Sequence, residues 1–177
     1  MQGFVNFASD IAYGLAWVIP TICYLGGGSL LLASLYGFWQ MQNPGSQASR
    51  RPFLPFITMF VAATLLSFDR MLTFANNTFG GGVTSSVAAG LTSYTAPTLD
   101  PSTLVGGTPA QTLLSIIAAF LYFFRVYGAL IVLLAVFSFY ETQKGNRNQN
   151  GHPLIQAMFG VAVMNVDTIA AAIIAYF

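Results

Sequence analysis

The 177-residue chain carries 6 Lys and Arg residues and 5 Asp and Glu residues, and 55% of its residues are hydrophobic. A soluble domain has about 25% charged residues, whereas only 6% are charged here, too few to cover a water-soluble fold. With a mean hydropathy of +0.68, the composition predicts an all-α integral membrane protein and excludes a basic patch that would bind nucleic acid.

Four apolar segments follow one another along the chain. Each is longer than the roughly 20 residues that cross the hydrocarbon core of a bilayer as a helix. Because the backbone finds no water in that core, it must form its own hydrogen bonds, and helices are the expected conformation. The segments cover about 11–41, 52–74, 111–140 and 153–177.

The first segment is too long for one straight span. Pro20 lacks a backbone donor and the glycines at 26–28 add flexibility, so we expect the helix to be kinked or broken between Pro20 and Gly28. In the broken form, residues 1–20 are a separate interfacial or tilted helix. No Lys or Arg precedes Arg50, and we therefore expect a retained span rather than a cleaved leader.

The connections between the segments differ in charge. The connections at 43–51 and 141–152 are short, polar and basic, whereas 75–110 is long and has Asp100 as its one charge. Basic residues concentrate on the cytoplasmic side of membrane proteins. We therefore expect cytoplasmic short loops, with both termini and the long loop outside. The basic loop residues are Arg50, Arg51, Lys144 and Arg147.

This layout predicts one membrane-embedded domain, 1–177, made of two tandem helical hairpins. The hairpins cover about 11–74 and 111–177 and are joined by an outer loop at 75–110. An offset of 100 residues aligns Gly28 with Gly128 and Gly45 with Gly145. An ancestral duplication explains this alignment, and so does the general similarity of any two apolar hairpins.

Arg125 is the one charge inside the third segment. Counted from the cytoplasmic ends of their helices, Arg125 and Asp167 lie about fifteen and fourteen residues up, or ~21–22 Å. A lone charge near the bilayer centre costs about 2.5–3.5 kcal/mol on insertion scales. We therefore expect an ion pair between Arg125 and Asp167 within the second hairpin.

Asp69 and Arg70 lie nearer the outer end of the second segment. Adjacent residues point to different sides of a helix, so these two either contact different neighbours or extend toward the outer headgroups. Most intramembrane charges orient and pack helices, and the functional alternative is a polar path or a phosphate site. Because Arg can donate two hydrogen bonds to phosphate, Arg125 and Arg70 are the candidate contacts for a bound phospholipid.

Small residues four positions apart allow close packing of helices in lipid. They predict helix association without naming the partner. The single cysteine, Cys23, is expected to be a buried and unreactive thiol. His152, the single histidine, is expected in a solvated loop, and no catalytic, metal or phosphate-loop motif is present, so no enzyme, metal or cofactor is predicted. The small residues are Ser29, Ala33, Gly37, Ala171 and Ala175.

Three stretches carry a resemblance to a known family: "RPFLPFITMFVAATLLSFDRMLTFANNTFGG", "FFRVYGALIVLLAVFSF" and "HPLIQAMFGVAVMNVDTIAAAI". Over about residues 20–177, the chain resembles the small hydrophobic membrane proteins of type IVB secretion and IncI-type conjugation systems, the IcmC/DotE-like and TraQ-like family. The family pattern matches a helix that opens after Pro52, the Thr78–Phe79–Gly80 end, Arg125 with Gly128, and Gly160 with Asn165.

The resemblance implies a part in an envelope machine that exports DNA or effectors from the bacterial inner membrane. The hairpin layout looks like two type IV conjugative pilin hairpins fused, which implies a self-assembling pilin-like subunit, extracted into a conjugative pilus and keeping a phospholipid. The chain's partners would then be copies of itself, lipid, other components of the machine, and DNA that meets the loop charges in a lumen. The alternatives are a non-polymerising inner-membrane component of the same machine, and a small transporter or channel.

Overall fold

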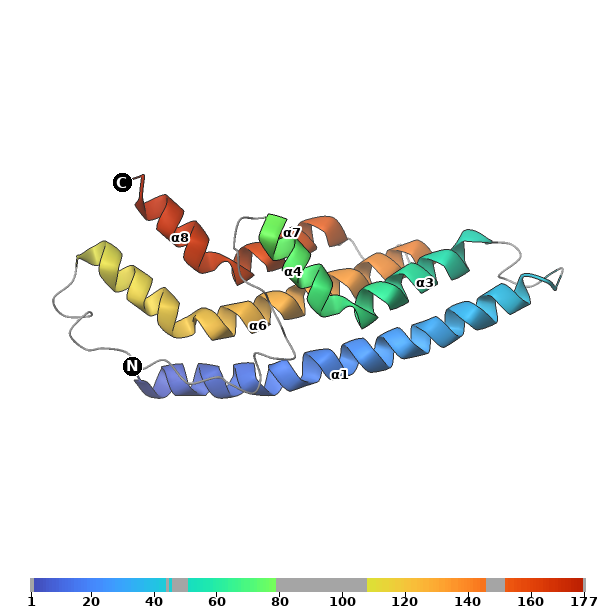
Figure 1. The fold of residues 1–177 in the computed structure, drawn as a ribbon, viewed down its shortest axis with the longest axis horizontal. Coiled ribbons are helices and arrows are strands. Elements are labelled where there is room, and N and C mark those ends of the chain that lie inside the picture. The colour runs from blue at the N-terminus through green and yellow to red at the C-terminus, as the bar shows by residue number, and fades with distance from the viewer. Residues whose placement is uncertain (1, 44, 46–50, 79–107, 146–151, 177) are drawn as a thin grey trace.

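The computed structural model describes residues 2–43, 45, 51–78, 108–145 and 152–176, and over these residues the regular elements are all helices. Two helices are long, and each is followed by a pair of short ones (Figure 1). In chain order they are α1 (Gln2–Gln40), α3 (Phe53–Leu66), α4 (Phe68–Thr78), α6 (Pro109–Lys144), α7 (Pro153–Met164) and α8 (Val166–Ile174).

The short helices return along the long ones, so the chain forms the two expected hairpins. α3 packs against α1, and α7 and α8 pack against α6. The hairpins meet mainly along α1 and α6, which run in the same direction (Figure 1). The prediction of an all-α membrane fold made of tandem hairpins is confirmed, with α1 and α6 each long and apolar enough to cross a membrane.

Of the two forms expected for the first helix, the broken form is wrong, because α1 continues through Pro20 and the glycines at 26–28. Figure 1 shows only a shallow change of direction along α1, so the kinked form of the expectation fits and the broken form does not. Next to Pro20, the hydroxyl of Thr21 donates to the carbonyl of Trp17 at 2.9 Å. The carbonyl that Pro20 leaves without its helical donor is that of Ala16, so the Thr21 bond adds a contact beside the proline and does not replace the missing one.

The return segments are the ones that break, which the sequence patterns did not predict. α3 and α4 are bent by 79° at Ser67, and α7 and α8 are bent by 71° at Asn165. The two break residues have the same backbone conformation, with φ/ψ of −107°/28° and −107°/27°. Each bent pair counts as one span at most, so the described chain has two spans, or up to four.

The hairpins repeat one packing arrangement in matching registers. A β-carbon on Gly27 would lie 2.9 Å from Leu66 Cγ, and one on Gly128 would lie 2.5 Å from Met164 Cγ. Gly27 and Gly128 are 101 positions apart, whereas Leu66 and Met164 are 98 apart. The long helices therefore correspond at an offset of 101 and the return helices at 98.

The break residues obey the same return-helix register, because Ser67 and Asn165 are 98 positions apart. So do Asp69 and Asp167, each in the first turn of the helix that follows a break. The contacts therefore make Gly27 the counterpart of Gly128. Direct alignment of the two sequences at an offset of 100 pairs Gly128 with Gly28 instead, one position away. The structural repeat is much clearer than the sequence identity.

The two hairpins are displaced along the helix axis. Gly26 lies level with Phe137, because a β-carbon on Gly26 would be 3.7 Å from the ring of Phe137. At the offset of 101 that relates the long helices, Phe137 corresponds to Tyr36. Tyr36 lies ten positions beyond Gly26, so hairpin two is displaced by ~15 Å along the helix axis relative to hairpin one. Near the other end, the rings of Phe4 and Phe120 are 5.7 Å apart, which gives a displacement of ~22 Å by the same reasoning. In Figure 1, α7 lies at the level of α4 along the long axis of the molecule, whereas α3 lies farther along α1, and α7 contacts α4.

Candidate functional site

The most polar intramembrane contact lies in the second hairpin, between α6 and α8. Arg125 Nη2 is 3.5 Å from Asp167 Oδ2, and 36% of each side chain remains accessible. The structure thus brings together the two residues whose equal depth suggested a pair. Asp167 also lies in the first turn of α8, where the positive end of the helix dipole favours a carboxylate.

The break at Asn165 aims Asp167 at Arg125. The buried Asn165 side chain donates from Nδ2 to the carbonyl of Val161 at 2.9 Å, and its backbone N–H is shared between Val161 and Ala162. These bonds occupy carbonyls at the end of α7 that the continued helix would have used. A new helix then starts in another direction and carries Asp167 in its first turn.

Close backbone contact fixes α7 against α6 beneath this pair. A β-carbon on Gly128 would lie 2.6 Å from the Gly160 carbonyl oxygen, and one on Gly160 would lie 2.8 Å from the Gly128 carbonyl oxygen. Neither glycine therefore accepts a larger side chain without movement of the backbone. The crossing sets the position of Arg125, one turn before Gly128 on α6.

The first hairpin has a similar break in its return helix, but different side chains lie around it. Ser67 Oγ donates to the Ala63 carbonyl at 2.7 Å, as Asn165 does to Val161. Asp69 takes the position of Asp167, but Tyr24 takes the position of Arg125 in the register of the long helices. A cavity of about 20 Å³, room for one water molecule, lies there. It is lined by Pro20, Cys23, Tyr24, Leu65, Leu66, Phe68 and Asp69.

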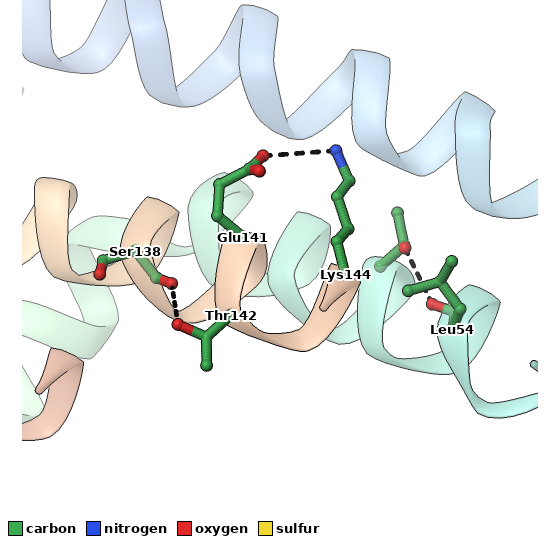
Figure 2. A network of polar contacts seen from close by, with 6 residues as sticks. Leu54, Ser138, Glu141, Thr142 and Lys144 are labelled. Atoms are coloured by element: carbon green, nitrogen blue, oxygen red, sulfur yellow. Dashed lines mark hydrogen bonds and ion pairs between the residues drawn. The ribbon is translucent and has the colours of Figure 1, made fainter. Parts of the chain in front are cut away.

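The basic loop residues that the structure describes come together across the hairpins. Arg51 Nη1 donates to the Lys144 carbonyl at 2.9 Å, next to the left-handed Gly145 that ends α6. Lys144 Nζ lies 3.4 Å from Glu141 and 4.2 Å from the centre of the Tyr140 ring. Figure 2 shows Glu141 and Lys144 extending on the same side of α6. The predictions for Arg50 and Arg147 fall outside the described residues.

The five small residues divide into one that packs within the chain and four that do not. Gly37 faces α3, where a β-carbon would lie 3.1 Å from Pro55. The other four are exposed in the described part of the chain, so they are accessible to helices outside it. The close contacts at Gly27, Gly128 and Gly160 were not singled out as packing sites, although the resemblance had pointed to Gly128 and Gly160. The four exposed residues are Ser29, Ala33, Ala171 and Ala175.

Cys23 and His152 lie in the surroundings that the sequence predicts. Cys23 is buried, and His152 is exposed at the start of α7. Arg70 is exposed on α4, and its neighbour Asp69 is half-buried, so the two do point to different surroundings. Among the residues that the structure describes, no three His, Cys, Asp or Glu side chains gather as a metal site would require.

Comparison of the chain with family models, curated proteins and solved structures finds no match. The class that fold and site define is an all-helical membrane protein built from two hairpins that share a glycine crossing and a broken return helix, although α8 packs against α6 and α4 makes no comparable contact with α1 in the described part of the chain. Each hairpin has a broken return helix with an Asp two positions beyond the break. One of the two Asp residues is paired with an intramembrane Arg.

Proposed function

We propose that this chain is a self-assembling, pilin-like structural subunit of a type IV, IVB-like conjugation or secretion apparatus. The observation that carries the proposal is the axial displacement of the hairpins by ~15–22 Å. A bilayer core is only about 30 Å thick, so two equivalent hairpins in a flat membrane are expected at equal depth. A displacement of this size is ordinary between neighbouring units of a helical fibre.

The apolar surface supports self-assembly. Large hydrophobic side chains are exposed on every described helix, from Phe4 in α1 to Ile173 in α8. Either lipid or further copies must cover so much apolar surface. The resemblance to proteins of type IVB secretion and conjugation systems provides the cellular setting, a bacterial inner membrane from which the subunit is extracted.

Bound phospholipid is part of the proposal. Arg125 keeps 36% of its side chain accessible beside Asp167, and Arg70 is exposed on α4. Both guanidinium groups can donate to a phosphate oxygen. At the other end of the molecule, Arg51 and Lys144 bring basic character to neighbouring loops, which in a fibre would face the lumen and meet phosphates of lipid or DNA.

The test is electron microscopy of sheared, detergent-free material from cells that express the whole apparatus, with mass spectrometry of the fibres. Fibres that contain this polypeptide support the proposal. Fibres that lack it, while the protein stays in the inner membrane with other components, would favour the non-polymerising alternative. Charge reversal at Arg51 and Lys144 that left assembly and transfer unchanged would remove their proposed role in the lumen.

A small transporter or channel is the second candidate, and the paired helix breaks favour it. Interrupted membrane helices at matching positions of two repeats are the usual location of a substrate or ion site. Here Ser67 and Asn165 are the breaks, each followed by an Asp. Solute flux into vesicles that contain only the purified protein, lost in Asp167→Asn, would support this function over the structural one.

A further inference from the structure

One face of α6 is buried in this chain, while the equivalent face of α1 is open. The α6 face forms part of the hydrophobic core shared with hairpin one. In the register of 101, Leu133, which is 1% exposed, corresponds to Leu32, which is 67% exposed. Tyr140, at 8%, corresponds to Trp39, at 58%. The full α6 face is Val126, Leu133, Val136 and Tyr140, and the open face of α1, the α1 stripe, is Leu25, Leu32, Leu35, Tyr36 and Trp39.

The complementary surface shows the same relation in reverse. In α3, Val61 is 1% exposed and belongs to the core that includes α6. In the register of 98 it corresponds to Phe159 of α7, which is 60% exposed. Ile57, which packs against the same core, corresponds to the exposed Ile155. We name Ile155, Phe159 and the exposed Tyr127 of α6 the hairpin-two face.

We propose that a second copy of this chain covers these surfaces: the α1 stripe of one copy packs on the hairpin-two face of the next. The contact repeats between copies the packing that already joins the two hairpins within one chain. Apolar residues stand on both sides, as they do in the intrachain interface. The inference rests on the proposed self-assembly and specifies which surfaces mediate it.

The intrachain contact is asymmetric, which makes the proposed assembly open. α6 packs on α3, but the exchanged pair, α1 and α7, makes no comparable contact among the described residues. Such a head-to-tail contact does not close into a twofold dimer, and repeated it generates a ring or a filament. Each step also displaces the next hairpin by ~15–22 Å, so a third hairpin would lie ~30–44 Å from the first, beyond a flat bilayer core. A filament is therefore the expected outcome.

The correspondence between the two hairpins predicts one specific contact between copies, which can be tested. Within the chain, Gly26 lies level with Phe137. The equivalent residues are Tyr127 and Tyr36, so Tyr127 of one copy should lie beside Tyr36 of the next. Within a single chain these two residues are separated by ~30 Å along the axis, because each lies ten positions from the matched pair in opposite directions. A bond between them can therefore form only between copies.

The experiment combines Tyr36→Cys and Tyr127→Cys in the full chain, on a Cys23→Ser background that removes the native thiol. Oxidation of the assembled protein should produce a ladder of covalent dimers, trimers and larger species. Each single-cysteine variant should produce no such ladder, because the contact joins two different residues. The register control is Tyr36→Cys with Leu134→Cys, since Leu134 is exposed on α6 but lies two turns, ~10 Å, from Tyr127.

The outcomes separate this proposal from the proposed function. A ladder from the Tyr36–Tyr127 pair, with the control pair unlinked, supports the contact. Fibres without that ladder overturn the contact and leave self-assembly in place through another surface. If neither fibres nor a ladder form while circular dichroism shows normal helical content, both proposals are overturned. A strong dimer from Tyr36→Cys alone would indicate a twofold contact and also overturn the proposal.

Discussion

The two hairpins share a backbone design, but different side chains surround it. Both place a glycine of the long helix against the return helix, and both break that return helix in the same backbone conformation. Hairpin two adds an ion pair between Arg125 and Asp167 where hairpin one has Tyr24 and Asp69. The backbone scaffold and the charged site are therefore separable, because the scaffold forms with and without the arginine.

The largest expected effect is at the glycine crossing of hairpin two. Gly128→Leu should destabilise the fold by about 3 kcal/mol or more, the upper end of overpacking effects, because its β-carbon would meet the backbone of Gly160. Gly28→Leu is the matched control: nothing lies within 4 Å of its β-carbon, and it should be nearly neutral. Reversible unfolding in mixed detergent micelles measures both. Equal losses would show that the crossing is not a rigid contact.

The ion pair should produce the next largest effect. Asp167→Asn leaves Arg125 without its carboxylate, and Arg125→Gln leaves Asp167 without its cation. A double-mutant cycle in the same unfolding measurement should give a coupling energy of about 1–2 kcal/mol between Arg125 and Asp167. A coupling indistinguishable from zero would mean that the accessible parts of both side chains interact mainly with their surroundings. Arg125→Gln paired with Asp69→Asn serves as the control, expected to be additive.

The two breaks should differ in strength because they differ in burial. Asn165 is 4% exposed, and Asn165→Ala removes its hydrogen bond to Val161, so we expect a loss of about 1 kcal/mol. Ser67 is exposed, and Ser67→Ala, which removes the bond to Ala63, should have less effect. Amide hydrogen exchange in α8 measures the effect at the Asn165 break, and exchange in α4 measures the effect at the Ser67 break. Faster exchange in α4 than in α8 after the respective changes would contradict this ranking.

The smallest effect is expected where the hairpins meet at the basic loops. Arg51→Gln removes an exposed hydrogen bond to the Lys144 carbonyl, and such surface contacts contribute about 0–1 kcal/mol. Thermal unfolding in detergent should therefore change little, whereas Arg51→Lys should be indistinguishable from the parent. A large loss of stability from Arg51→Gln would show that the contact joins the hairpins and is more than a surface contact.

The sequence predicted the hairpins and the ion pair because both follow from long-range features of composition. Apolar length predicts spans, and equal distance from the loops places Arg125 and Asp167 at similar depth. The breaks at Ser67 and Asn165 were missed because neither residue is a proline or glycine and the apolar run continues through both. Pro20 is the converse, since a long helix packed on two neighbours stays continuous, with only a shallow change of direction, despite a missing donor.

The displacement of the hairpins could not be predicted in the same way. It is set by which side chains meet between α1 and α6, such as Phe4 with Phe120. Depth counted from the loops assumes instead that all loops of one kind lie at one level. The register offset of 101 in the long helices against 98 in the return helices was also hidden. Sequence alignment does not distinguish Gly27 from Gly28, whereas in the structure only Gly27 of these two contacts the return helix.

The equivalence of the two hairpins has a consequence for how such a fibre would be imaged. Its smallest repeating backbone unit is a hairpin, so averaged density at modest resolution would obey a symmetry with twice as many subunits as there are polypeptides. Positions such as 24 and 125, tyrosine in one half and arginine in the other, together with the packing of α8 on α6, would reveal where each molecule begins.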